Sequence, residues 1–177
     1  KLSEKLRAFL STKPKEKKDE KNLTTNFHKS LGDILGTIEI STPFGEHLLV
    51  ERSYLDSHIH GNVQLNLIYN ISGEIIKLIA KCPDYEDLDF RRAVFIDTET
   101  TGLAGGSGTL AFLIGVGFFE GDSFKVLQYF ISDYDKEAAA LYSLSNLLKK
   151  FDSLVTFNGK SYDIPLLEAR YMISRME

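Results

Sequence analysis

The sequence has one cysteine, no long apolar run and no internal repeat, and each of these shortages excludes a class of protein. Cys82 has no second cysteine to pair with, so a disulfide framework is excluded and we expect a reducing, cytoplasmic compartment. Residues 110–119 form the longest uncharged apolar run, which is far too short to span a membrane. The first residues lack the long apolar stretch of a signal peptide.

The 177 residues have an ordinary globular composition, with 43% hydrophobic and 26% charged residues, so the chain can bury one sizeable core. The net charge of −4 is uneven along the chain. Residues 1–22 hold eight basic and four acidic side chains, whereas the remainder holds thirteen basic and twenty-one acidic ones. An acidic main body is unlike a typical nucleic-acid binder, but it suits a carboxylate site that collects cations. The basic start reads as a solvated tail that could touch phosphates.

Three segments follow from the composition along the chain. Residues 1–26 are a charged tail or short helix, residues 27–89 a small β-rich segment, and residues 90–177 an α/β domain. The chain begins with lysine and stops inside a helical pattern without a stop signal. We therefore expect a fragment of a longer protein, with the last domain incomplete.

Two hairpins are predicted in the middle segment. Residues 37–55 alternate around Pro43-Phe44-Gly45, which is typical of two strands and a turn. Residues 62–80 look like a second hairpin that turns at Ser72-Gly73.

The last segment has the order β-β-β-α-β-α. Apolar runs and turn residues predict strands over 93–97, 110–119, 124–131 and 153–157, a helix over 132–151, and a second helix that begins at Asp163-Ile164-Pro165. The first three strands form an antiparallel meander. The helical crossover makes the fourth strand parallel to one of them, so we expect a mixed sheet with helices.

Asp97 and Glu99 end the first of these strands. Residues two apart on a strand lie on one face, so both carboxylates share a face and Thr98 lies on the other. Buried carboxylates side by side are costly, so something must neutralise them. Lysine or arginine partners, or exposure to solvent at the strand end, would do so. A divalent metal ion would also do so, and oxygen-only ligands favour Mg²⁺ or Mn²⁺.

A third carboxylate, Asp163, follows in the stretch LVTFNGKSYDIPLL, residues 154–167. If the strand at 153–157 pairs with the strand at 93–97, Asp163 comes near Asp97 and Glu99 at the carboxyl ends of two neighbouring strands. The helix N-terminus adds N–H groups that suit phosphate. This arrangement is typical of a two-metal phosphoryl-transfer site.

The two motifs together resemble a known family. DTETTGL, residues 97–103, followed by NGKSYDIPLL, residues 158–167, is similar to the first two motifs of the DEDD 3′–5′ exonucleases, which have the ribonuclease-H-like fold. The glycine-rich LAGGSGTLAFLIGVG, residues 103–117, resembles the predicted bacterial exonucleases of the YprB type. The resemblance covers about residues 90–177. It implies a metal-dependent 3′–5′ exonuclease that acts on DNA or RNA, with two Mg²⁺ or Mn²⁺ ions and a single-stranded 3′ end as substrate.

The resemblance also implies roles for the acidic residues. Asp97 and Glu99 would be catalytic and bind the metal ions, and Asp163 would help to hold the second ion. The family has a fourth acidic residue on a later helix, in a Tyr-x-x-x-Asp or His-x-x-x-Asp pattern. Two such matches, Tyr85 to Asp89 and Tyr129 to Asp133, lie in the linker and on the third strand, where the family does not have this motif.

Substrate contacts are implied in the same way. Thr100 would meet the terminal nucleotide, Leu103 would wedge against its base, and Asn158 would face the substrate. From the residues alone, Thr100 is equally a turn residue, Leu103 equally a core residue, and Asn158 with Gly159 equally a plain turn. Lys160 could touch a phosphate or be a solvated lysine. An exposed aromatic ring at 157 or 162 could stack on single-stranded bases.

Two other functions stay open at this point. One is a catalytically incomplete module of the same fold that binds nucleic acid or a protein partner. The other is a proofreading-like domain that belongs to a polymerase.

Overall fold

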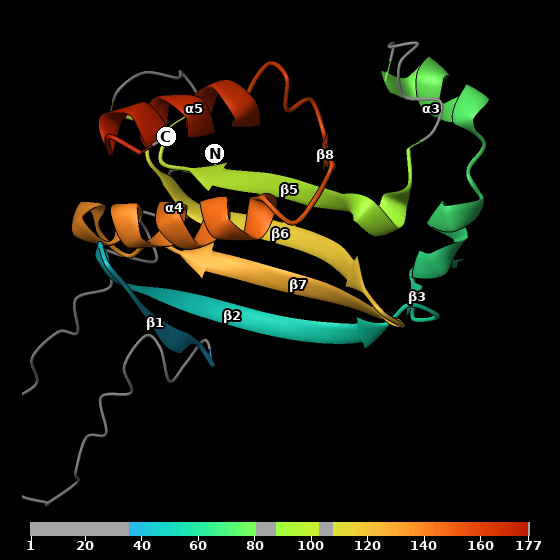
Figure 1. The fold of residues 1–177 in the computed structure, drawn as a ribbon, viewed down its shortest axis with the longest axis horizontal. Helices are drawn as coiled ribbons and strands as arrows, with labels where there is room; N and C mark the ends of the chain where they lie inside the picture. Colours follow the sequence, from blue (N-terminus) through green and yellow to red (C-terminus); the bar gives the residue numbers. More distant parts are fainter. Residues whose placement is uncertain (1–35, 81–87, 103–107, 177) are drawn as a thin grey trace, which may run out of the picture.

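A six-stranded mixed sheet forms the centre of the computed structural model, which describes residues 36–80, 88–102 and 108–176 (Figure 1). Its strand order is β1-β2-β7-β6-β5-β8. β5, β6 and β7 are an antiparallel meander, and β8 pairs with β5 in parallel, as the sequence predicts. The strands are β1 Ile38–Thr42, β2 Gly45–Leu55, β5 Ala93–Thr100, β6 Ala111–Glu120, β7 Ser123–Phe130 and β8 Ser153–Thr156.

Two helices, α4 (Tyr134–Leu148) and α5 (Asp163–Ile173), cover one face of this sheet (Figure 1). The Asp133 side chain caps α4 by accepting a hydrogen bond from the backbone N–H of Tyr134 at 2.7 Å. The core between the sheet and the two helices is made of alternate residues of the central strands and the apolar stripes of the helices. Its most buried members include Val94, Ile114, Val116, Leu141 and Leu144. In the described residues, no helix is both long and apolar enough to cross a membrane.

The first predicted hairpin is present. The turn between β1 and β2 has Thr42 opposite Gly45, whose φ of 109° favours glycine, and the Thr42 hydroxyl donates to the Gly45 carbonyl at 2.8 Å. β2 then pairs with β7 from Leu48 to Leu55, so the hairpin extends the main sheet. The division of the chain at residue 90 stays a prediction.

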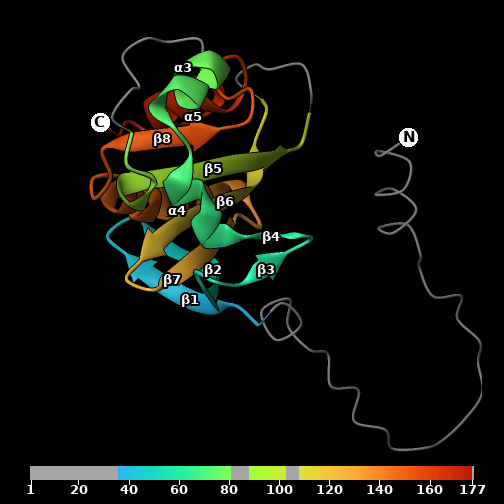
Figure 2. The ribbon, with the colours of Figure 1, turned by 90° about the vertical axis from the view of Figure 1, so that its right-hand side faces the viewer.

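The prediction of a second hairpin over 62–80 is wrong. Only Val63–Gln64 is a strand there, β4, and it pairs with β3 (Ile59–His60). A short 3-10 helix, η1 (Leu65–Asn70), and the helix α3 (Gly73–Ala80) follow (Figure 2). Ser72 starts the helix, because its hydroxyl accepts from the N–H of Ile75 and its carbonyl from the N–H of Ile76.

The turn between β8 and α5 fixes where α5 begins. Asn158 has a φ of 57°, and the predicted Asn158-Gly159 turn is present. A Cβ at position 159 would lie 1.9 Å from Oγ1 of Thr156, so only glycine fits so close to β8. The Gly159 carbonyl then accepts from the N–H of Ile164 at 2.9 Å, which brings the first turn of α5 against the end of β8.

Candidate active site

β5 carries the two carboxylates that the spacing singles out. Val94, Ile96 and Thr98 are buried on the face that α4 and α5 cover. Asp97 and Glu99 are exposed on the opposite face, as expected for residues two apart on a strand.

Exposure to solvent accounts for how these two carboxylates are tolerated. Among the described residues, no lysine, arginine or histidine forms an ion pair with Asp97 or Glu99. The alternative of basic partners therefore does not apply within the described ranges. Two solvent-exposed carboxylates without a cationic partner remain available as oxygen ligands.

Asp163 lies on the helix-covered side of the strand. It is the first residue of α5 and is 3% exposed. The hydroxyl of Thr98 donates to its Oδ1 at 2.6 Å. The structure thus brings Asp163 to the residue between Asp97 and Glu99, but holds it on the face that Thr98 occupies.

This geometry tests the fit of a metal ion. Asp97 and Glu99 suit a hard divalent ion, because both are exposed oxygen donors on one face. Asp163 is bonded to Thr98 instead of facing them. Within residues 36–80, 88–102 and 108–176, no group of three or more histidine, cysteine or acidic side chains is arranged to hold a metal ion. The described residues therefore supply two fitting ligands and one carboxylate beside them.

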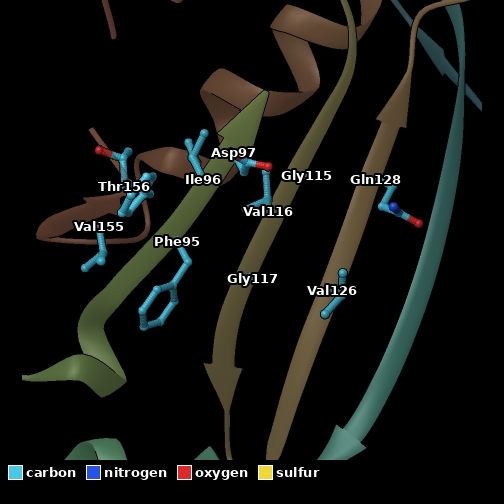
Figure 3. A pocket seen from close by; sticks show the side chains of 11 residues that line it. Phe95, Ile96, Asp97, Gly115, Val116, Gly117, Val126, Gln128, Val155 and Thr156 are labelled. Atoms are coloured by element: carbon cyan, nitrogen blue, oxygen red, sulfur yellow. The ribbon is translucent and has the colours of Figure 1, made fainter. Parts of the chain in front are cut away.

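An open groove of about 650 Å³ runs along the face that carries Asp97 (Figure 3). Its floor is β6, where Gly115 is the register partner of Asp97 and Gly117 the partner of Phe95. Because Gly115 has no side chain, the sheet is open beside Asp97, whereas the Phe124 ring packs over Gly117. Val126 and Gln128 of β7 form the opposite wall (Figure 3). Apart from Asp97, the lining is uncharged.

The candidate substrate-binding residues lie around the same end of the sheet. Asn158 and Lys160 are exposed in the turn between β8 and α5. Thr100 is half-buried, and its hydroxyl is engaged within the protein, as it donates to the Gly102 carbonyl at 2.9 Å. Leu103 lies outside the described residues.

The two aromatic candidates differ in exposure. Phe157 is 93% exposed at the end of β8 and lines the groove with Asp97. Tyr162 is half-buried, and its hydroxyl lies 2.9 Å from that of Thr100. Phe157 is therefore the freer of the two rings.

Two contacts at the candidate site are not predictable from the sequence. Thr98 is the hydrogen-bond donor to Asp163, across 65 positions of the chain. Tyr162 contacts Thr100 across 62 positions. Strand alternation does indicate that positions 98 and 100 face the helices, but it does not indicate which helix residue meets them.

Comparison with known proteins agrees with this geometry. Residues 94–177 match the model of the RNase_H superfamily. The fold is ribonuclease-H-like. The antiparallel meander, the parallel β8 and the helices on the sheet are the arrangement that the sequence resemblance implies.

The similarity to a longer bacterial protein covers more of the chain than the RNase_H match does. The uncharacterized protein YprB of Bacillus subtilis (strain 168) is 35% identical over 136 residues, which are 72% of this chain and 31% of that protein. The chain therefore spans less than a third of the length of this relative. The likeness to the RNase_H superfamily covers the part of the chain that carries Asp97, Glu99 and Asp163.

Proposed function

We propose that the protein is a metal-dependent 3′–5′ exonuclease that hydrolyses the phosphodiester bonds of DNA or RNA at a single-stranded 3′ end. The observation that carries this proposal is the pair of exposed carboxylates, Asp97 and Glu99, on one face of β5 in a ribonuclease-H-like sheet. Their exposed oxygens suit Mg²⁺ or Mn²⁺. The match of residues 94–177 to the RNase_H superfamily supports nuclease chemistry at this strand.

Three carboxylates have roles in metal binding under this proposal. Asp97 and Glu99 hold the metal ions, and Asp163 fixes the second ion or its water shell. Bound divalent ions supply an activated water and stabilise the leaving 3′ oxygen. We include Asp163 in this role because it is hydrogen-bonded to Thr98, and Thr98 lies between Asp97 and Glu99 in the strand. The carboxylate is thereby held beside β5, on the face opposite to that of Asp97 and Glu99.

The turns beside the carboxylates would hold the 3′ end of the nucleic-acid strand. Asn158 and Lys160 are exposed beside the start of α5, where an amide can bond a nucleotide and an ammonium group can bond a phosphate. Thr100 and Leu103 would meet the terminal nucleotide and its base. Phe157, almost fully exposed beside the groove, adds a ring on which a base can stack.

A second candidate function is a module that binds nucleic acid or a protein partner without cleaving. The observation in its favour is that the described residues contain no group of three or more potential ligands arranged for a metal ion. Under this alternative, Asp97 and Glu99 would be solvated residues at a strand end.

Hydrolysis of labelled oligonucleotides tests the proposal. Single-stranded DNA and RNA with a 5′ label are incubated with the protein and Mg²⁺ or Mn²⁺. We expect products that shorten stepwise from the 3′ end. Asp97→Asn should lower the rate by about two orders of magnitude or more, because it removes a charged metal ligand.

Asp122→Asn is the matched control, because Asp122 is an exposed carboxylate in the turn between β6 and β7. This variant should cleave at the unaltered rate. Strands that stay intact with both metal ions would contradict the exonuclease and favour the binding module.

A further inference from the structure

Two side-chain links join the end of β5 to the start of α5. Thr98 donates to Asp163 at 2.6 Å, and the hydroxyls of Thr100 and Tyr162 lie 2.9 Å apart. Positions 98 and 100 are on the same side of the strand, and positions 162 and 163 are consecutive. The end of β5, which carries Asp97 and Glu99, is thus joined at two successive points to the start of α5, whose first residue is the third carboxylate, Asp163.

The second link is a small closed network. The Tyr162 hydroxyl donates to the Gly102 carbonyl at 3.1 Å and contacts the Thr100 hydroxyl. The Thr100 hydroxyl lies 2.9 Å from the same carbonyl and can donate to it. Because each hydroxyl has one proton, two of these three contacts are hydrogen bonds at any one time. Both hydroxyls therefore converge on one backbone oxygen, two residues beyond Thr100.

This network lies where the strand ladder is irregular. Glu99 is paired with Leu113 and Thr100 with Ala111, so the register shifts between Glu99 and Thr100. A bulge of this kind loosens the regular hydrogen bonding of a strand. The unpaired residue is Phe112 on β6, and beyond it the N–H of Thr101 donates to the Leu110 carbonyl at 2.9 Å. The side-chain bonds of Thr100 and Tyr162 therefore add to this one backbone bond in holding the end of β5.

We propose that Tyr162 is a positioning residue that acts through Thr100. Through this contact it keeps the end of β5, and with it Glu99, at a fixed position relative to Asp163 for metal binding. This inference rests on the proposed function, since it concerns the same carboxylates. It assigns the hydroxyl of Thr100 to the protein's own network, so Thr100 would meet the terminal nucleotide through its other atoms. It also assigns the phenol of Tyr162 to the strand end and not to base stacking.

Calorimetric titration with Mn²⁺ tests the positioning role without requiring cleavage. Tyr162→Phe and Thr100→Val each remove one hydroxyl and keep the shape of the side chain. Each should weaken Mn²⁺ binding about fivefold, the equivalent of one hydrogen bond. The double variant should be no weaker than the worse single variant, because both changes break the same network. Thr100→Ser should bind Mn²⁺ as the unaltered protein does.

Tyr171→Phe is the matched control. The Tyr171 hydroxyl is also a hydrogen-bond donor on α5, to the Leu141 carbonyl at 3.0 Å, but it joins α5 to α4 instead of to β5. The control should melt at a lower temperature and keep its Mn²⁺ affinity.

The outcomes separate this inference from the proposed function. Mn²⁺ binding that Tyr162→Phe leaves unchanged, or changes no more than Tyr171→Phe does, would overturn the positioning role alone. Independent, multiplying losses in the double variant would overturn the shared network. A lack of Mn²⁺ binding in the unaltered protein would overturn the metal-dependent function and the positioning role with it.

Discussion

His47 is a buried histidine on β2 and is only 2% exposed. Its Nε2 lies 2.8 Å from the hydroxyl of Ser143 on α4, and its ring packs beside that of Tyr129. Burial lowers the pKa of His47, because a charged imidazolium is poorly solvated there. The folded protein therefore favours the neutral ring, which links its stability to pH.

The direction in which pH changes the stability follows from the lowered pKa of His47. Since the pKa of His47 is lower in the folded state than in the unfolded state, the folded state binds this proton less readily. The contribution of the neutral ring is present above the unfolded pKa of about 6.5 and is lost as the pH falls below it. We expect the melting temperature to fall between pH 7 and pH 5, and to fall less in His47→Gln. His58→Gln, at an exposed position, should keep the slope of the unaltered protein. An equal slope in His47→Gln would contradict this role.

At the level of single residues, the sequence predicts that Asp97 and Glu99 share a face of their strand, but it does not predict which residues this strand contacts. The two-residue spacing of Asp97 and Glu99 is enough to predict their common face, because alternation is a local property of a strand. The bond from Thr98 to Asp163 joins residues far apart in the chain. Its donor is a plain threonine between two more conspicuous acids, so no local pattern indicates it.

The two helices are joined by a buried ion pair. Arg170 of α5 donates to both carboxylate oxygens of Glu137 on α4, at 2.6 Å and 2.5 Å. Both residues are 4% exposed. The Glu137 carboxylate raises the pKa of Arg170 further, so the guanidinium stays charged. This contact fixes how α4 and α5 lie together on the sheet.

Removing one partner should cost far more than removing both. Arg170→Leu leaves the Glu137 carboxylate buried without its partner, which we expect to lower the free energy of unfolding by about 3–5 kcal/mol. The double variant Glu137→Leu with Arg170→Leu should regain much of this loss, because a buried pair can be replaced by apolar residues. Urea denaturation of both single variants and the double variant measures this. Strictly additive losses would contradict the pairing.

At the level of elements, long apolar runs predicted the sheet well. The meander and the parallel strand follow from continuous apolar segments and a helical crossover, which are strong patterns. The stretch that forms η1 and α3 resembles a hairpin in sequence, because apolar residues occupy every second position over 63–71. The missed signal is the capping serine, Ser72, ahead of a short apolar stripe of which Ile76 is the buried member.

At the scale of the whole molecule, charge and architecture are consistent with each other. The net charge is −4, and the part after residue 22 is the acidic part. An acidic body attracts divalent cations more readily than phosphates, so affinity for nucleic acid would depend on bound metal ions and on contacts such as Lys160 and Phe157. The central claim of this account is therefore that Asp97 and Glu99 hold a divalent ion.

Calorimetric titration with Mn²⁺ on the unaltered protein, on Asp97→Ala and on Asp122→Ala tests this claim most directly. We predict binding to the unaltered protein and to Asp122→Ala, and its loss in Asp97→Ala, while the melting temperature of Asp97→Ala stays close to that of the unaltered protein because residue 97 is exposed. Binding that survives in Asp97→Ala, or is missing from the unaltered protein, would contradict the claim.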